Sequence, residues 1–200
     1  MYWKTMFEIP VIKYSVGIVA RNRKGFSFKL LVVKTPTAKT LGMTSYCRNG
    51  NHVLFFDFDG NTLDEVVYQL RILQTEYGLS EFYIFENDTE NSFHAVCLDK
   101  LPLSKAIEVI HQTTADSSFK YAPLRYAMKK WVLRVEPKGE REKPKYLFNL
   151  TPIINGKIIK SNPHRLFLNL HYKMKIKKDR LFDNETKMDF FKYYTANRTK

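Results

Sequence analysis

The sequence predicts an α+β fold built around one buried strand, residues 52–58, that ends in two carboxylates. Short aromatic and β-branched runs alternate with segments whose apolar residues recur at helical spacing. With 44% hydrophobic and 14% aromatic side chains, 200 residues can bury a proper core. We expect a domain over 1–150, with a hairpin over 1–50 and a core over 51–139. An extension over 151–200 follows, and whether it packs on the same domain stays open.

The first elements precede the buried strand. Two strands, 6–20 and 26–34, are predicted to pair as a hairpin across the basic turn 21–25. The segment 35–50 is basic and contains Thr-rich turns, so we expect a connecting loop there.

A helix is predicted directly after the carboxylates. Thr62 and Glu65 form a capping box, and Gly78 is a natural stop. A hairpin of two strands is predicted next, at 81–86 and 92–98. A second helix follows at 102–114, and a last strand at 131–136.

The resulting order from 52 to 137 is β-α-β-β-α-β, the split βαβ of ferredoxin-like and RRM-like folds. Right-handed crossovers then place the four strands in the order 4-1-3-2, with both helices on one side. Residues two apart on a strand share a face. We therefore expect three polar pairs to meet on the open face, namely Asp57 with Asp59, Ser92 with His94, and Arg134 with Glu136.

Two ionised carboxylates so close repel each other unless a cation or a proton lies between them. Asp57 and Asp59 are therefore expected to form a divalent-metal site or to have shifted pKa values. Purely structural interpretations of these residues also stay open. Asp59 can be part of a simple turn, and His94 can be a core residue. Arg134 and Glu136 can form a cross-strand ion pair.

The charge of the chain is uneven. Of the net +13, residues 140–200 contribute 15 basic and 6 acidic side chains. This favours a polyanionic partner, nucleic acid before membrane, although a solvated basic surface stays open. Basic residues interleaved with aromatic ones are typical of a surface that binds single strands, although a basic helix packed by its aromatic residues stays open. The residues expected to do so are Lys173, Lys175, Lys177, Lys178 and Arg180.

Cys47 and Cys97 lack the spacing of a zinc site or a disulfide framework, which fits a reducing, cytoplasmic compartment. No apolar run is long enough to span a membrane.

The Asp-x-Asp at a strand end, the later Ser-x-His and a further strand with an acid resemble the archaeo-eukaryotic primase superfamily, over roughly residues 50–145. The resemblance implies an RRM-like catalytic palm that binds two divalent ions, Mg²⁺ or Mn²⁺. It implies that the acids Asp57, Asp59 and Glu136 bind the metal ions. It implies that His94, with Ser92 beside it, contacts the phosphates of the incoming nucleotide. Arg134 and Lys138 would also bind phosphate.

The implied function is that of a primase or primase-polymerase, which transfers nucleotides from nucleoside triphosphates along a single-stranded DNA or RNA template. A separate helicase would open the duplex, and the gene would belong to a small replicon such as a virus or plasmid. Two alternatives stay open. One is a non-catalytic RRM-like binder of single strands. The other is a phosphatase of the haloacid-dehalogenase type. Residues 57–63 resemble the signature of that family, except that Asn61 is inserted in it.

Overall fold

The chain divides into two compact units, Thr40–Lys192 and a second unit of Met1–Lys39 with Tyr193–Lys200. The computed structural model describes residues 16–21, 27–32, 38–47, 49–125, 129–138, 140–153, 156–184 and 188–195.

In the smaller unit, β1 (Val16–Arg21) and β2 (Ser27–Val32) pair antiparallel. The register runs from Val16 opposite Val32 to Arg21 opposite Ser27. The predicted hairpin is confirmed for these strands, while residues 6–15 and 22–26 lie outside the described residues.

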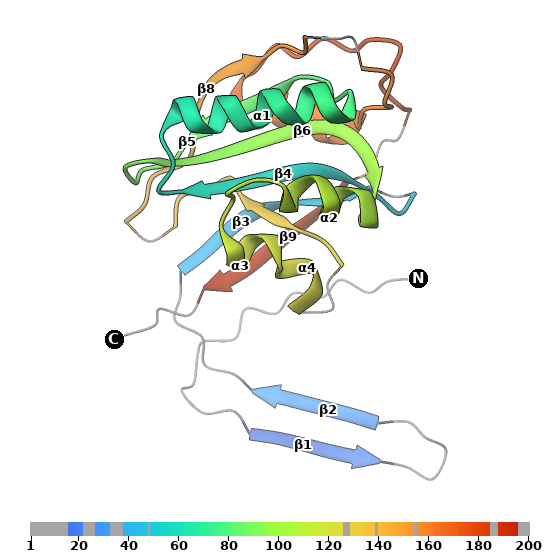
Figure 1. The fold of residues 1–200 in the computed structure, drawn as a ribbon. Coiled ribbons are helices and arrows are strands. Elements are labelled where there is room, and N and C mark those ends of the chain that lie inside the picture. The colour runs from blue at the N-terminus through green and yellow to red at the C-terminus, as the bar shows by residue number, and fades with distance from the viewer. Residues whose placement is uncertain are drawn as a thin grey trace. The chain divides into compact units, whose positions relative to one another are not determined.

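The larger unit is built on a sheet whose strand order is β7-β3-β4-β6-β5-β8, with β9 pairing to β3 (Figure 1). Neighbouring strands from β7 to β8 pair antiparallel, and helices accompany the sheet, so the predicted α+β class is confirmed. The strands are β3 (Ala38–Cys47), β4 (Asn51–Asp59), β5 (Phe82–Glu86), β6 (Ser92–Pro102), β7 (Val132–Arg134), β8 (Lys145–Leu150) and β9 (Met188–Thr195).

The strand order agrees with the predicted order in one part and differs in another. β4, β6 and β5 are neighbours in the expected sequence of first, third and second strand. The fourth strand was expected to pair with the first, but β7 pairs with β3 instead, which places Gly42 opposite Arg134.

The prediction of a loop over 35–50 is wrong for the ten residues of β3. Met43, Thr44 and Ser45 are buried, and Ser45 accepts a 3.1 Å hydrogen bond from the Trp131 amide through its Oγ. The strand is stabilised by partners distant in sequence, which override its weak local pattern.

The helix α1 (Leu63–Tyr77) begins and ends where the sequence predicted. Thr62 and Glu65 form the capping box, and Gly78 adopts the left-handed conformation at φ 61°. The helix α2 (Leu103–His111) confirms the second predicted helix with an earlier end. Figure 1 shows both in front of the sheet, and two short helices follow, α3 (Ser117–Lys120) and α4 (Ala122–Arg125).

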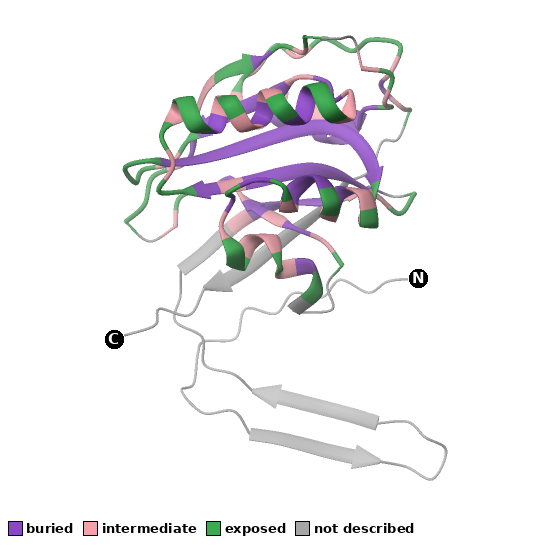
Figure 2. Ribbon diagram, viewed as in Figure 1, coloured by how far each residue is buried: buried purple, intermediate pink, exposed green. Residues whose placement is uncertain are grey.

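The core lies on both sides of β4 and β6, the most completely buried strands in Figure 2. Phe56 stacks with Phe58 on one face of β4. Phe55 points to the other face, where its ring lies 6.2 Å from that of His164. His164 belongs to α5 (Asn162–Tyr172), a helix whose place in the chain the sequence did not predict. The face that we expected to be open is therefore partly covered by α5.

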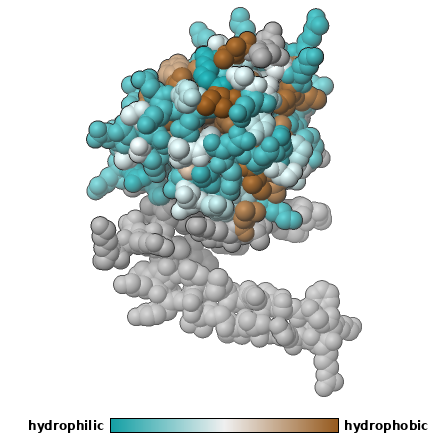
Figure 3. Space-filling view, viewed as in Figure 1, coloured by the Kyte–Doolittle hydropathy of each residue, from teal (hydrophilic) through white to brown (hydrophobic). Residues whose placement is uncertain are grey.

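The face of the molecule seen in Figure 3 is mostly hydrophilic, with apolar side chains in separate spots. Among the described residues, no helix is both long and apolar enough to cross a membrane.

Candidate functional site

The end of β4 brings together the two motifs found in the sequence. β4 and β6 run antiparallel, with Asp57 opposite His94 and Asp59 opposite Ser92. His94 Nε2 lies 3.2 Å from Asp57 Oδ1. Ser92 Oγ donates a 2.6 Å hydrogen bond to Asp59 Oδ1. Side chains more than thirty residues apart in sequence therefore form one cluster at the end of the sheet.

The turn between β5 and β6 fixes this register. The Gly60 amide donates a 2.8 Å hydrogen bond to the Asn91 carbonyl, so the turn closes directly against the end of β4. Both residues have positive φ, 79° for Gly60 and 53° for Asn91. Glycine and asparagine are the residues that tolerate this conformation best, which explains their use at the two positions.

Asp57 is ionised at neutral pH although only 28% of its side chain is exposed. Burial by itself would raise the pKa of this carboxyl, but the charge and hydrogen bond of His94, with the charges of Arg134 and Arg141, bring the pKa below its ordinary value. Asp59 is exposed at the end of the strand. The cluster thus presents two carboxylates to solvent from one strand end.

Three cations gather beside Asp57. Lys138 and Arg141 are joined by two backbone hydrogen bonds of 2.9 and 3.1 Å, so a tight turn holds their side chains near each other. Burial lowers the pKa of the Lys138 ammonium, and the charges of Arg141 and Arg134 lower it further. Three cations beside two carboxylates leave an excess of positive charge, which favours the binding of a polyanion.

Asn87 links the cations to the carboxylates. Its Nδ2 donates a 2.9 Å hydrogen bond to Ser92 Oγ, which in turn donates to Asp59. Arg134 Nη2 donates a 3.4 Å hydrogen bond to Asn87 Oδ1, while Arg134 Nη1 reaches the Glu142 carbonyl at 2.7 Å. A continuous chain of hydrogen bonds therefore positions Ser92 and Arg134 relative to each other.

The sequence did not identify Asn87 or Arg141. Asn87 is the first residue of a polar turn, where asparagine is common for purely structural reasons. Arg141 follows Lys138 by three residues, and this spacing of two cations was the signal in the sequence that could have identified it.

Glu136 has a different neighbour from the one expected. Its Oε1 lies 3.2 Å from Nε2 of His171 on α5, and the same nitrogen lies 2.9 Å from the Val135 carbonyl. The grouping of Glu136 with the two aspartates is therefore not found among the described contacts. The side chain instead links the end of β7 to α5.

The carboxylate oxygens of the cluster are of the chemical type that binds a hard divalent cation. Carboxylate oxygens are the ligands that Mg²⁺ and Mn²⁺ prefer. The contacts described for Asp57 and Asp59 use Oδ1 of each, which leaves Oδ2 of each for a cation. Within the described ranges, however, no three His, Cys, Asp or Glu side chains are arranged as a complete metal site.

The basic residues predicted to bind nucleic acid lie in the extended segment that follows α5. Lys173, Lys175, Lys177, Lys178 and Arg180 are all exposed. Met174 and Ile176, between them, are half-buried and pack against the core. The lysines therefore line the outer side of a segment that is anchored to the larger unit.

No family model, curated protein or solved structure matches the chain. The geometry of the cluster therefore carries the case for a function.

Proposed function

We propose that the chain is a primase-like nucleotidyltransferase, which adds nucleotides to a 3′-hydroxyl on a single-stranded DNA or RNA template. The observation that carries the proposal is the meeting of paired carboxylates, a histidine and three cations at one strand end. These residues are Asp57 and Asp59, His94, and Arg134, Lys138 and Arg141.

Each group has a role in this reaction. The 3′-oxygen forms a bond to the α-phosphorus, the bond from that phosphorus to the bridging oxygen breaks, pyrophosphate leaves, and the hydroxyl proton passes to water. Asp57 and Asp59 would hold Mg²⁺ or Mn²⁺, which activates the attacking oxygen and neutralises the leaving group. Because Asp57 stays ionised, it is a fixed anchor for the cation.

The remaining side chains serve the triphosphate. Arg134 is held by hydrogen bonds to Asn87 and to the Glu142 carbonyl, so its guanidinium is oriented before any ligand arrives. Lys138 and Arg141 add charge that neutralises the phosphates. Nε2 of His94 faces Asp57, so in the protonated ring the second nitrogen, Nδ1, can donate its N–H to a phosphate oxygen.

We further infer that β4, α1, β5, β6, α2 and β7 form an RRM-like palm, into which β3 enters between the first and fourth strands. The order β4-β6-β5 supports this assignment. In this proposal a separate helicase supplies the single-stranded template.

The test is the incorporation of labelled nucleotides on single-stranded DNA and RNA templates with Mg²⁺ or Mn²⁺, with and without a primer. Asp57→Asn and Asp59→Asn should each lower incorporation by about 100-fold or more, because each removes a metal ligand and little buried area. Glu76→Gln, which neutralises an exposed acid on α1, is the matched control and should behave as wild type.

Normal incorporation by both aspartate variants would contradict the proposal. Binding of single strands by a wild type that incorporates nothing would favour the non-catalytic binder. Hydrolysis of a phosphomonoester through an aspartyl-phosphate would favour the phosphatase.

A further inference from the structure

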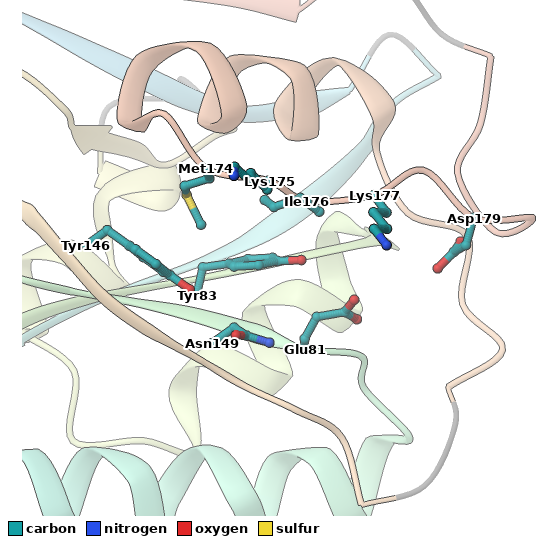
Figure 4. Close-up of a pocket in the computed structure, with 9 residues that line it drawn as sticks. All are labelled: Glu81, Tyr83, Tyr146, Asn149, Met174, Lys175, Ile176, Lys177 and Asp179. Carbon is teal, nitrogen blue, oxygen red and sulfur yellow. The ribbon is translucent and has the colours of Figure 1, made fainter.

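A groove lies on the face of the sheet that also carries His94. Phe85 pairs with His94, and Tyr83 lies two residues away on the same strand, so its side chain shares that face. The groove has a volume of about 470 Å³. In Figure 4, Tyr83, Tyr146 and Asn149 from β5 and β8 lie on one side of it, and the segment that carries Met174 and Lys177 lies on the other.

The second wall is fixed by α5. Asn169 pairs with the backbone of Ile176 twice, accepting from its amide at 2.8 Å and donating to its carbonyl at 2.9 Å. Arg165 Nη1 donates a 3.0 Å hydrogen bond to the same carbonyl. These bonds hold the segment extended, with Met174 and Ile176 half-buried and Lys175 and Lys177 exposed along the groove. The groove is therefore formed before any ligand binds.

Several polar groups in the groove have no partner among the described residues. The side chain of Tyr83 is buried, with 4% exposure, and its hydroxyl points along the groove in Figure 4. No hydrogen bond is described for this hydroxyl, for that of Tyr146 or for the amide of Asn149, and no anion is described beside Lys175 or Lys177. These groups face the open groove and are free to donate to a ligand rich in acceptors, as the few polar groups of a binding site do.

The acids of the groove do not oppose an anionic ligand. Glu81 and Asp179 both face the buried ammonium of Lys160, at 3.6 and 2.6 Å. Lys160 offsets one of these two negative charges, and the ammonium groups of Lys175 and Lys177 at the exposed rim outweigh the other. The charge at the mouth of the groove is positive.

The groove continues beyond the residues named so far. A second cavity of about 440 Å³ shares Glu81 and Asp179 with the first and is lined by Arg180. At the other end, Tyr146 pairs with Phe85, which pairs with His94. Two strand spacings, roughly 10 Å, therefore separate the backbone at Tyr146 from that at His94.

We propose that this groove holds a single strand of nucleic acid, with a base against the ring of Tyr146 and phosphates at Lys175 and Lys177. Aromatic rings beside a row of cations bind single strands without reading their sequence. The identification of this strand as the template rests on the proposed function, whereas the binding itself does not.

The test is fluorescence anisotropy of labelled single-stranded DNA and RNA oligonucleotides over a series of salt concentrations. Tyr146→Leu should weaken binding by about tenfold, because it removes the stacking ring and keeps an apolar side chain in its place. Lys175→Gln combined with Lys177→Gln should lower the slope of log affinity against log salt by about 1.4, or about 0.7 for each lost phosphate contact.

Matched controls separate the groove from general charge and general aromatic character. Tyr68→Leu removes a tyrosine that is 69% exposed on α1, and Lys129→Gln with Lys157→Gln removes two exposed lysines outside the groove. Both controls should bind as wild type. Asn149→Ala changes an exposed side chain and supports the proposal if it weakens binding without lowering the melting temperature.

Wild-type binding by the folded groove variants, or an equal loss of salt slope in the lysine control, would overturn the groove as the binding site. Weakened binding in the groove variants supports it even if the wild type incorporates no nucleotide. In that case only the proposed function fails.

Discussion

Asp57 combines partial burial with a carboxyl that stays ionised, and this combination depends on its neighbours. His94 is the largest of the influences that lower its pKa, ahead of Arg134 and Arg141. Burial raises the pKa of Asp57, and His94 opposes this effect. If His94 is removed, the pKa of Asp57 therefore rises. The histidine therefore has two roles in the proposed reaction, since it can contact phosphate and it keeps the metal ligand ionised.

His94→Ala should shift the acid limb of the pH profile of kcat/KM to higher pH. The limb reports the protonation of Asp57, which must be ionised to bind a cation, and its pKa rises when the imidazole is lost. The variant should also raise KM for the nucleoside triphosphate and lower kcat. Because the pKa of Asp57 in the wild type lies below the ordinary value of 3.8, the steady-state kinetics must extend down to about pH 3 to locate this limb.

His111→Ala is the matched control, because it removes a histidine of α2 that contacts Tyr121 and not the cluster. An unchanged acid limb and unchanged KM in His94→Ala, with only a lower melting temperature, would contradict the account and leave His94 as a core residue.

At the residue scale, the sequence predicted the motif residues and not their supports. Asp57, Asp59, Ser92 and His94 could be placed together because strand alternation and hairpin order determine which side chains share a face. Asn87 could not be recognised, because its role depends on a hydrogen bond from Arg134, 47 residues away.

α5 changes the interpretation of the C-terminal part of the chain. Leu168 is fully buried, and Tyr172 packs at 4.6 Å from Phe85. Deletion from residue 162 onward would therefore remove part of the core, and single charge substitutions are the better test of strand binding.

β3 and α5 escaped prediction for the same physical reason, since each is stabilised mainly by contacts with distant elements.

The packing of α5 should make the protein sensitive to acid through His164. Its Nε2 lies 2.7 Å from the Thr44 carbonyl, and burial lowers its pKa to about 4. The unfolded chain takes up this proton near pH 6.5 and the folded chain only near pH 4, so the free energy of unfolding falls as pH drops through this window. The contribution is roughly 2 to 3 kcal/mol between pH 7 and 4.5.

Urea unfolding of wild type and His164→Gln at pH 7 and 4.5 measures this effect. The variant should lose less stability on acidification than wild type, although it starts less stable. Equal losses in the two proteins would contradict the assignment of the acid sensitivity to His164.

At the scale of the whole molecule, the larger unit presents two adjoining features on one side of its sheet. The carboxylate and cation cluster lies at the end of β4 and β6, and the aromatic and basic groove lies over β5 and β8. The sequence predicted the α+β class and three neighbouring strands, because hydrophobic period and capping are local signals. The groove was beyond prediction, because its walls come from segments about ninety residues apart.

The central claim is that the cluster at the end of β4 binds a nucleoside triphosphate together with a divalent cation. The most direct measurement is calorimetric titration of a nucleoside triphosphate into wild type and variants, with Mn²⁺ and with a chelator. Wild type should bind more tightly with Mn²⁺, and the double variant Asp57→Asn with Asp59→Asn should lose that difference. Arg141→Ala should weaken binding in both conditions, because its charge acts on the phosphates directly. An undiminished effect of Mn²⁺ in the double variant would contradict the claim.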